Sequence, residues 1–288
     1  MTAFLISLAV LLGGYFIYGA IVEKAFGTDA GRPTPAYTRR DGVDYLPMPT
    51  WKVFLIQFLN IAGIGPIFGA IMGVMFGPAA FLWIVLGTIF AGAVHDFLSG
   101  MISVRMGGLS LPEIVGSQLG RGVKNVMGIF SIVLLLMVGA VFVTSPAGIL
   151  AGMTPAWLSG EVWVLIIFAY YVCATVLPVD KLIGSLYPVF GFALLFMAGG
   201  LLVYLLFGGV SIPDGIADGL QSRRANGYPR FPMMFVSIAC GAISGFHATQ
   251  SPMMARCIKS EKLGRPVFYG AMVAEGIVAL IWAAAAIS

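Results

Sequence analysis

Long apolar runs alternate with short polar connections along the whole chain. A helix needs about 20 mostly apolar residues to cross the hydrocarbon core of a bilayer. The pattern predicts about eight such spans, and the expected fold class is all-α, a helical bundle that crosses the membrane several times within one transmembrane domain, residues 1–288. The predicted spans are 2–22, 52–76, 78–104, 125–151, 161–178, 185–207, 231–256 and 266–288.

Composition agrees with this pattern and excludes several classes of protein. Hydrophobic residues make up 59% of the 288 positions and charged residues 10%, whereas about a quarter of an ordinary soluble domain is charged. A soluble enzyme, a nucleic-acid-binding module and a disordered chain all need more polar surface than this. The lipid bilayer is therefore the expected partner of the chain, and nucleic acid is not.

Lysine and arginine are distributed unevenly between the two predicted sides of the membrane. The connections after the first, third, fifth and seventh spans hold thirteen of the 16 basic residues. The opposite side holds Arg223, Arg224 and Arg230. Because basic residues favour the cytoplasmic side, this bias predicts that the N-terminus lies outside. The first run lacks a basic leader and a cleavage site, so we expect a retained helix rather than a signal peptide.

The second span is interrupted by small residues near its middle. Gly63, Gly65, Pro66 and Gly69 fall within seven residues. Proline removes a backbone hydrogen bond, and each glycine costs about 1 kcal/mol relative to alanine in a helix. We favour an unwound segment that lines a site. The alternative is close helix packing through the glycines at 65, 69 and 73, which are spaced four residues apart.

The seventh span has a comparable interruption. Ser244, Gly245, His247 and Gln250 gather where polar groups are expensive unless they face a cavity or a partner. Two interrupted spans in corresponding halves are typical of the binding site of an inverted-repeat transporter. Asn60, with Gln57 one helical turn before it, is a further hydrogen-bonding candidate. The predicted substrate-binding residues are Asn60, Gly63, Gly65, Pro66, Gly69, Ser244, Gly245, His247 and Gln250.

Three ionisable residues lie inside apolar spans. They are His95 and Asp96 in the third span and Glu275 in the eighth. An aspartate at the centre of a spanning helix costs about 2.5–3.5 kcal/mol on insertion scales, so coupling to a proton or cation is one explanation for it. A structural role, with Asp96 bonded to a neighbouring helix, is the other. With two histidines in the chain we expect no metal site, and no cofactor. Glu113 is expected in the first turn of a short interfacial helix.

Three segments resemble the carbon starvation CstA family of bacterial inner-membrane transporters. They are NIAGIGPIFG (60–69), GAVHDFLSGMISVRMGGLSLPEIVG (92–116) and SGFHAT (244–249), and their order and spacing agree with the family. The resemblance implies nutrient uptake during carbon starvation, with peptides the usual substrate and pyruvate that of some members. It also implies coupling to H⁺ or Na⁺ and a LeuT-type fold of two five-helix inverted repeats.

On that plan, residues 1–22 form a leading helix, 52–207 the first repeat and 231–288 the start of the second. Three core helices are then absent and the second repeat is incomplete, so we expect a C-terminally truncated member. The alternative is a non-transporting subunit or sensor that needs a partner or the missing helices. The oligomeric state, including a homo-oligomer, stays open. An intramembrane hydrolase has no Gly-x-Ser-x-Gly or His-Glu-x-x-His motif to support it.

Overall fold

A computed structural model describes residues 1–176, 179–212 and 230–288 of the chain, and this part is built from helices without a strand. By length and composition, five of the described helices can cross a membrane, or seven when each of two bent pairs counts as one span. The expectation of an all-α membrane bundle is confirmed. The fifth predicted span corresponds to α10 (Gly160–Val176), and its last two residues, 177–178, lie outside the described ranges, as do Arg223 and Arg224.

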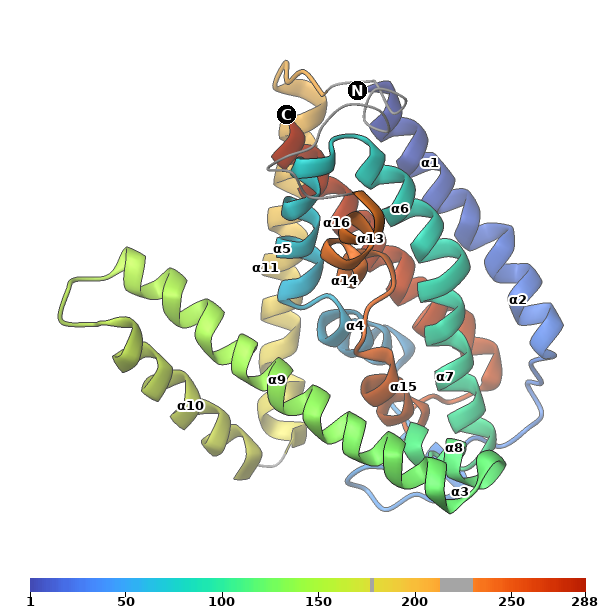
Figure 1. Cartoon of the computed structure of the whole chain (residues 1–288). Coiled ribbons are helices and arrows are strands. Elements are labelled where there is room, and N and C mark those ends of the chain that lie inside the picture. The colour runs from blue at the N-terminus through green and yellow to red at the C-terminus, as the bar shows by residue number, and fades with distance from the viewer. Residues whose placement is uncertain (177–178, 213–229) are drawn as a thin grey trace. The chain divides into compact units, whose positions relative to one another are not determined.

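The chain divides into two compact units. The core unit comprises Met1–Leu111 with Phe190–Ser288, and the hairpin unit comprises Pro112–Val189. Helix α11 (Val179–Phe207) belongs to both. Figure 1 labels most of the helices. The other helices of the core unit are α1 (Thr2–Phe16), α2 (Tyr18–Phe26), α3 (Pro35–Thr38), α4 (Thr50–Ile61), α5 (Ile64–Met72), α6 (Ala79–Gly87), α7 (Ala93–Arg105), α13 (Arg230–Ser237), α14 (Ala239–Ala242), α15 (His247–Ala255) and α16 (Gly270–Ile287).

Both predicted interruptions are present. The second span is split into α4 and α5, which meet at an angle of 46° across Ala62 and Gly63. Pro66 stands in the first turn of α5, where its missing N–H costs no helical bond. The seventh span bends by 63° after α13 and leaves the helical conformation again between α14 and α15, where Ser244 has a φ of +48°.

Two short π-helical turns are also present in the core unit. The segment Thr88–Gly92 joins α6 to α7, and the segment Arg265–Tyr269 leads into α16. A π turn disturbs the regular ladder of helical hydrogen bonds. The buried hydroxyl of Tyr269 donates to the carbonyl of Ile89 over 3.0 Å, so one π turn supplies a partner for the other.

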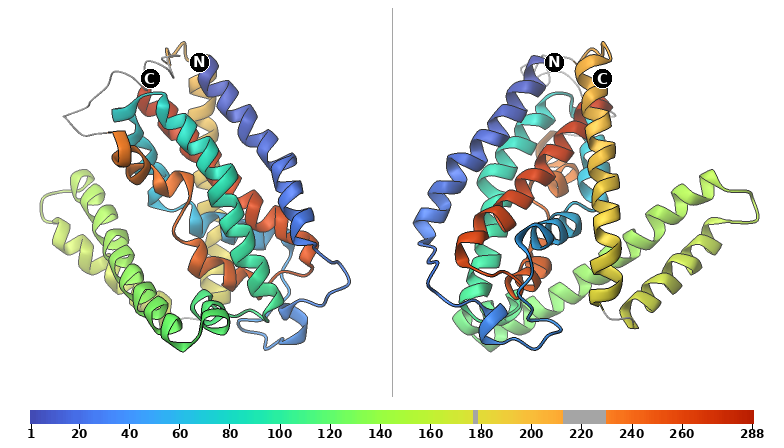
Figure 2. Two further views of the ribbon diagram at one scale, coloured as in Figure 1. Left: turned by 45° about the vertical axis from the view of Figure 1, so that its right-hand side comes forward. Right: turned by 180° about the vertical axis from the view of Figure 1, so that it is seen from behind.

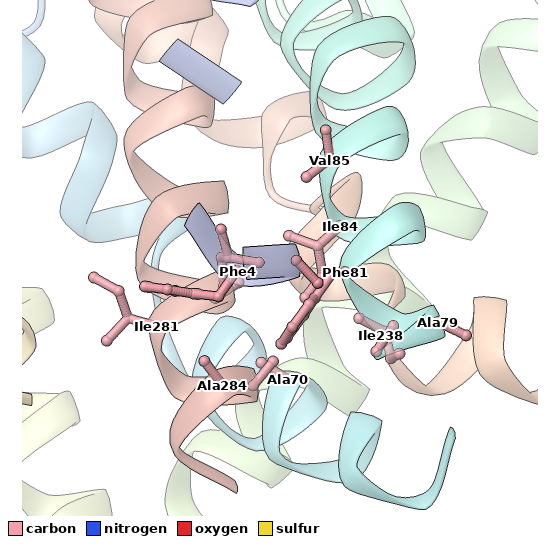
Figure 3. Close-up of a cluster of buried hydrophobic side chains, with 14 of the residues drawn as sticks. Phe4, Ala70, Ala79, Phe81, Ile84, Val85, Ile238, Ile281 and Ala284 are labelled. Atoms are coloured by element: carbon pink, nitrogen blue, oxygen red, sulfur yellow. The ribbon is translucent and has the colours of Figure 1, made fainter. Parts of the chain in front are cut away.

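An apolar cluster holds one end of the core unit together. The cluster includes Phe4 of α1, Phe81 and Ile84 of α6, and Ile281 of α16 (Figure 3). Phe4 and Phe81 meet edge to face with ring centroids 6.4 Å apart. Burying an aromatic or branched side chain of this size contributes about 1.5–3 kcal/mol when the alternative is water. This cluster fixes α6, and therefore its continuation α7, against α16.

The basic connections meet at one end of the core unit. Arg105, at the end of α7, donates to the carbonyl of Gly27 over 2.7 Å, and Arg256 donates to the carbonyl of Gly108 over 3.0 Å. Arg105 also pairs with the buried Glu261 over 3.1 Å. The connections after the first, third and seventh predicted spans therefore lie on one side, as the charge distribution predicts.

The hairpin unit contains two long helices and a short one, besides the beginning of α11. The pair α9 (Arg121–Met153) and α10 run side by side (Figure 2). Trp163 donates to the hydroxyl of Thr154 over 3.0 Å, which closes the turn between them. The short helix α8 (Leu111–Leu119) carries Glu113 in its first turn, as predicted.

Candidate functional site around Asp96

Asp96 lies at the meeting point of three helices of the core unit. Its carboxylate is fully buried on α7. The side-chain amide of Gln57, on α4, donates to both oxygens, over 2.8 Å to Oδ1 and 3.1 Å to Oδ2. The hydroxyl of Ser251, on α15, donates to Oδ1 over 2.5 Å. Both interrupted spans therefore supply a hydrogen bond to the same buried acid.

Glycines on α7 and in its π turn allow this convergence. A Cβ on Gly92 would lie 2.7 Å from the carbonyl oxygen of Ala242, the last residue of α14. A Cβ on Gly100 would lie 2.5 Å from the ring of Phe268. Contacts this short leave no room for any side chain. The absence of a side chain at these positions brings the break in the seventh span, and the π turn that precedes α16, against α7.

The two histidines of the chain form a pair beside Asp96. The Nδ1 atoms of His95 and His247 are 3.1 Å apart, which is a hydrogen-bonding distance. His247 is fully buried, and its Nε2 lies 3.8 Å from Oδ2 of Asp96. His95 is exposed on the surface of the core unit. The sequence suggested neither contact, because 152 positions separate the two histidines.

Glu275 of α16 is a second fully buried acid, and neither of its carboxylate oxygens has a hydrogen-bond partner in the described part of the chain. Other buried polar atoms in the same condition include the Oε1 of Gln57, the Oγ1 of Thr88 and the Nε2 of Gln250. Most buried polar groups in proteins are paired, and an unpaired one calls for an explanation such as a functional role. The core unit thus concentrates unpaired polar atoms on the helices around the site.

Two glycines of the second span lie against the seventh span. A Cβ on Gly65 would overlap the sulfur of Cys240 on α14, and one on Gly69 would lie 2.9 Å from the carbonyl oxygen of Ser237. These two glycines therefore support close packing of α5, which was the alternative to a role in binding. The unwinding itself occurs just before them, at Gly63.

The remaining predicted binding residues have different surroundings. Asn60 donates to the carbonyl of Ile56 in its own helix over 2.9 Å. Pro66 packs near Gly241, where an added Cβ would lie 3.7 Å from the proline Cα. Ser244 is buried, whereas a Cβ on Gly245 would meet no atom within 4 Å. Open space thus adjoins the second break at Gly245.

Ser251 is the site residue that the sequence analysis missed. It stands four positions after His247, one helical turn on, so both side chains lie on one face of α15. That spacing was a usable signal, since residues three or four apart are neighbours on a helix. Among the described residues, no group of three or more His, Cys, Asp or Glu is arranged to hold a metal ion.

Comparison with known proteins identifies the family. The model of the carbon starvation protein CstA family matches the chain over residues 1–157 and 147–288. This chain belongs to the CstA family. It is 46% identical to an uncharacterized membrane protein of Haemophilus influenzae, over 98% of this chain and 89% of that relative. No solved structure matches the chain.

More distant members of the CstA family carry functional names. The chain is 28% identical to the peptide transporter CstA of Campylobacter jejuni and 29% identical to the pyruvate/proton symporter BtsT of Escherichia coli, over 96% of its own length in each case. It spans about half the length of these two relatives, 48% and 47% respectively. The alignments run over 344 and 338 positions, so both relatives also contain residues that have no counterpart in these 288.

Proposed function

We propose that this chain forms the core of a secondary active transporter that takes up peptides, or a small carboxylate such as pyruvate, across the bacterial inner membrane during carbon starvation. The hydrogen bonding of Asp96 by residues of both interrupted spans carries the proposal. The names of the relatives support the substrate classes, since one is a peptide transporter and another a pyruvate/proton symporter. We place the N-terminus outside, on the strength of the basic residues in the connections.

In this proposal, coupling depends on the position of Asp96 between the two interrupted spans. As a carboxylate, Asp96 accepts hydrogen bonds from Gln57 of α4 and Ser251 of α15. Hydrogen bonds to a charged acceptor contribute more than those to a neutral one, about 1.5–3 kcal/mol against about 1. Gain or loss of a proton or cation at Asp96 therefore changes how strongly the two broken spans are held together. A ligand that changes this balance shifts the population of conformations.

The substrate site of this proposal is the backbone at the two breaks. Helices α5 and α15 both begin inside a span, at Ile64 and His247. The first N–H groups of a helix lack helical partners and favour negative charge. Peptides and pyruvate both carry a carboxylate that suits such groups. Open space beside Gly245 provides room at one of these helix starts.

Transport assays in proteoliposomes test the proposal. We expect the purified chain to accumulate labelled pyruvate or a labelled dipeptide when a pH gradient is imposed. Asp96→Asn should abolish gradient-driven uptake, whereas Glu161→Gln, an exposed acid in the hairpin unit, should leave it unchanged. Undiminished uptake by Asp96→Asn would remove Asp96 from the coupling mechanism. No uptake by folded wild-type protein would favour the alternative of a non-transporting subunit.

A further inference from the structure

The hydrogen bond between the two histidines constrains where their protons lie. A neutral imidazole has one N–H donor and one acceptor nitrogen. With the two Nδ1 atoms 3.1 Å apart, one of them carries hydrogen and the other accepts it. The tautomers of His95 and His247 are therefore linked. When one ring carries its hydrogen on Nδ1, the other ring must carry its hydrogen on Nε2.

The opposite nitrogen of His247 faces the less occupied oxygen of Asp96. Oδ1 accepts from both Gln57 and Ser251, whereas Oδ2 accepts a longer bond of 3.1 Å from Gln57. Oδ2 is also the oxygen that faces Nε2 of His247, over 3.8 Å. That nitrogen is buried and has no hydrogen-bond partner in the described part of the chain. A small movement of α15 would shorten this separation to a hydrogen-bonding distance.

The three groups also form a sequence from exposed to buried. His95 is exposed on the face of α7 that carries Leu98 and Ile102, whereas His247 and Asp96 are fully buried. An ionisable side chain on an otherwise apolar face of a spanning helix is expensive in lipid and usually faces water or protein. The exposed ring of His95 is therefore the natural point where a proton enters or leaves this row.

We propose that His95 and His247 relay protons between water and Asp96. This rests on the proposed function, because it supplies the route to the coupling acid. For release, Oδ2 of Asp96 gives its proton to Nε2 of His247. The Nδ1 proton of His247 passes to Nδ1 of His95, and His95 loses its Nε2 proton to water. One proton leaves Asp96 and one reaches water, both rings end neutral with exchanged tautomers, and the reverse sequence loads Asp96.

Chemical rescue tests the relay in proteoliposomes at fixed pH. His95→Ala should slow gradient-driven uptake about tenfold or more, as expected when a positioned proton-transfer group is lost. Exchange of labelled for unlabelled substrate should change little, because exchange needs no net proton release. Added imidazole should restore the uptake of His95→Ala in a saturable way, since the lost ring was exposed. Leu98→Ala, on the same face of α7, is the matched control and should behave as wild type.

The outcomes separate the relay from the proposed function. If His95→Ala and His247→Ala take up substrate at the wild-type rate while Asp96→Asn does not, the relay is wrong and the coupling role of Asp96 stands. Slow uptake by His95→Ala that imidazole fails to restore also overturns the relay. If Asp96→Asn retains coupled uptake, Asp96 is not the coupling acid and the relay fails with it. If folded wild-type protein takes up no substrate, the proposed function itself fails.

A spectroscopic measurement tests the relay without any transport activity. In protein with ¹⁵N-labelled histidine, we expect one protonated and one unprotonated Nδ1, coupled through the shared hydrogen. Asp96→Asn should alter the signals of the Nε2 atom of His247. Two protonated or two unprotonated Nδ1 atoms in the wild type would overturn the relay, even in a preparation that does not transport.

Discussion

Replacement of Gly65 by alanine tests whether this glycine packs a helix or binds a substrate. The new Cβ would overlap the sulfur of Cys240 and lie 2.6 Å from the Cβ of that residue. Overpacking of this kind costs about 1–3 kcal/mol. The gain in helix propensity on replacing glycine offsets at most about 1 kcal/mol of it. We therefore expect Gly65→Ala to lower the free energy of unfolding by about 1–2 kcal/mol.

Thermal unfolding in detergent measures this effect. For a chain of this size, each 1 kcal/mol corresponds to about 2–4 °C in Tm. The matched control is Gly13→Ala in α1, where a Cβ would meet no atom within 4 Å, and its Tm should stay the same or rise. Removing the opposing side chain with Cys240→Gly should relieve the clash. The double variant should thus show a coupling energy of about 1 kcal/mol or more.

Gly69→Ala is the contrasting case. Its Cβ would lie 2.9 Å from the backbone carbonyl of Ser237, and no side-chain substitution removes that atom. We expect a similar loss of stability without any rescue by Cys240→Gly. A Gly65→Ala protein with wild-type Tm and no coupling to Cys240 would refute the packing argument. A normal Tm combined with weakened substrate binding would favour the binding role for Gly65 instead.

Three further predictions concern acidic residues. Glu261→Gln should lower the free energy of unfolding by about 2 kcal/mol, because the buried carboxylate loses its charge pairing with Arg105, whereas Tm should hold in the exposed Glu161→Gln control. Glu275→Met should raise the free energy of unfolding by about 1 kcal/mol or more, and with it Tm, because an unpaired buried acid is removed. A lower Tm would indicate that Glu275 has a stabilising partner. Backbone N–H groups of residues 45 and 43 lower the pKa of Asp41 from 3.8, so the loop 41–45 is stabilised above that pH and loosens as pH falls through the lower folded value. Hydrogen exchange of the amide of residue 45, corrected for its intrinsic pH dependence, should show protection that Asp41→Ala abolishes; equal exchange in the two proteins would contradict this.

The interruptions were predictable because their cause is local. Glycine and proline disrupt a helix through their own backbone, so the breaks near Gly63 and Ser244 are visible in the sequence. Whether Gly65 faces a ligand or a neighbouring helix depends on which residue lies opposite. That residue is Cys240, 175 positions later in the chain, and no local pattern specifies it.

The partners of Asp96 were likewise predictable only in part from the sequence. An acid buried in an apolar span is expected to have hydrogen-bond partners, but the need for partners does not identify the residues that supply them. Gln57 was a visible candidate since it lies one turn before Asn60 on a broken span. Ser251 and the histidine pair emerge only when α7 and α15 are packed together. The assignment of residues 52–207 and 231–288 to two inverted repeats remains a prediction.

The π turn at Thr88–Gly92 sets the rotational phase of the helix that follows it. An α-helix advances about 100° per residue, and a π turn advances less, so reversion of this segment to α-helix would rotate α7 by roughly a quarter turn relative to α6. Asp96 would then point away from Gln57. The hydroxyl of Tyr269 donates a hydrogen bond to the Ile89 carbonyl inside this π turn and so opposes that rotation. The direction in which the buried acid faces is thus governed by a phenol on another helix.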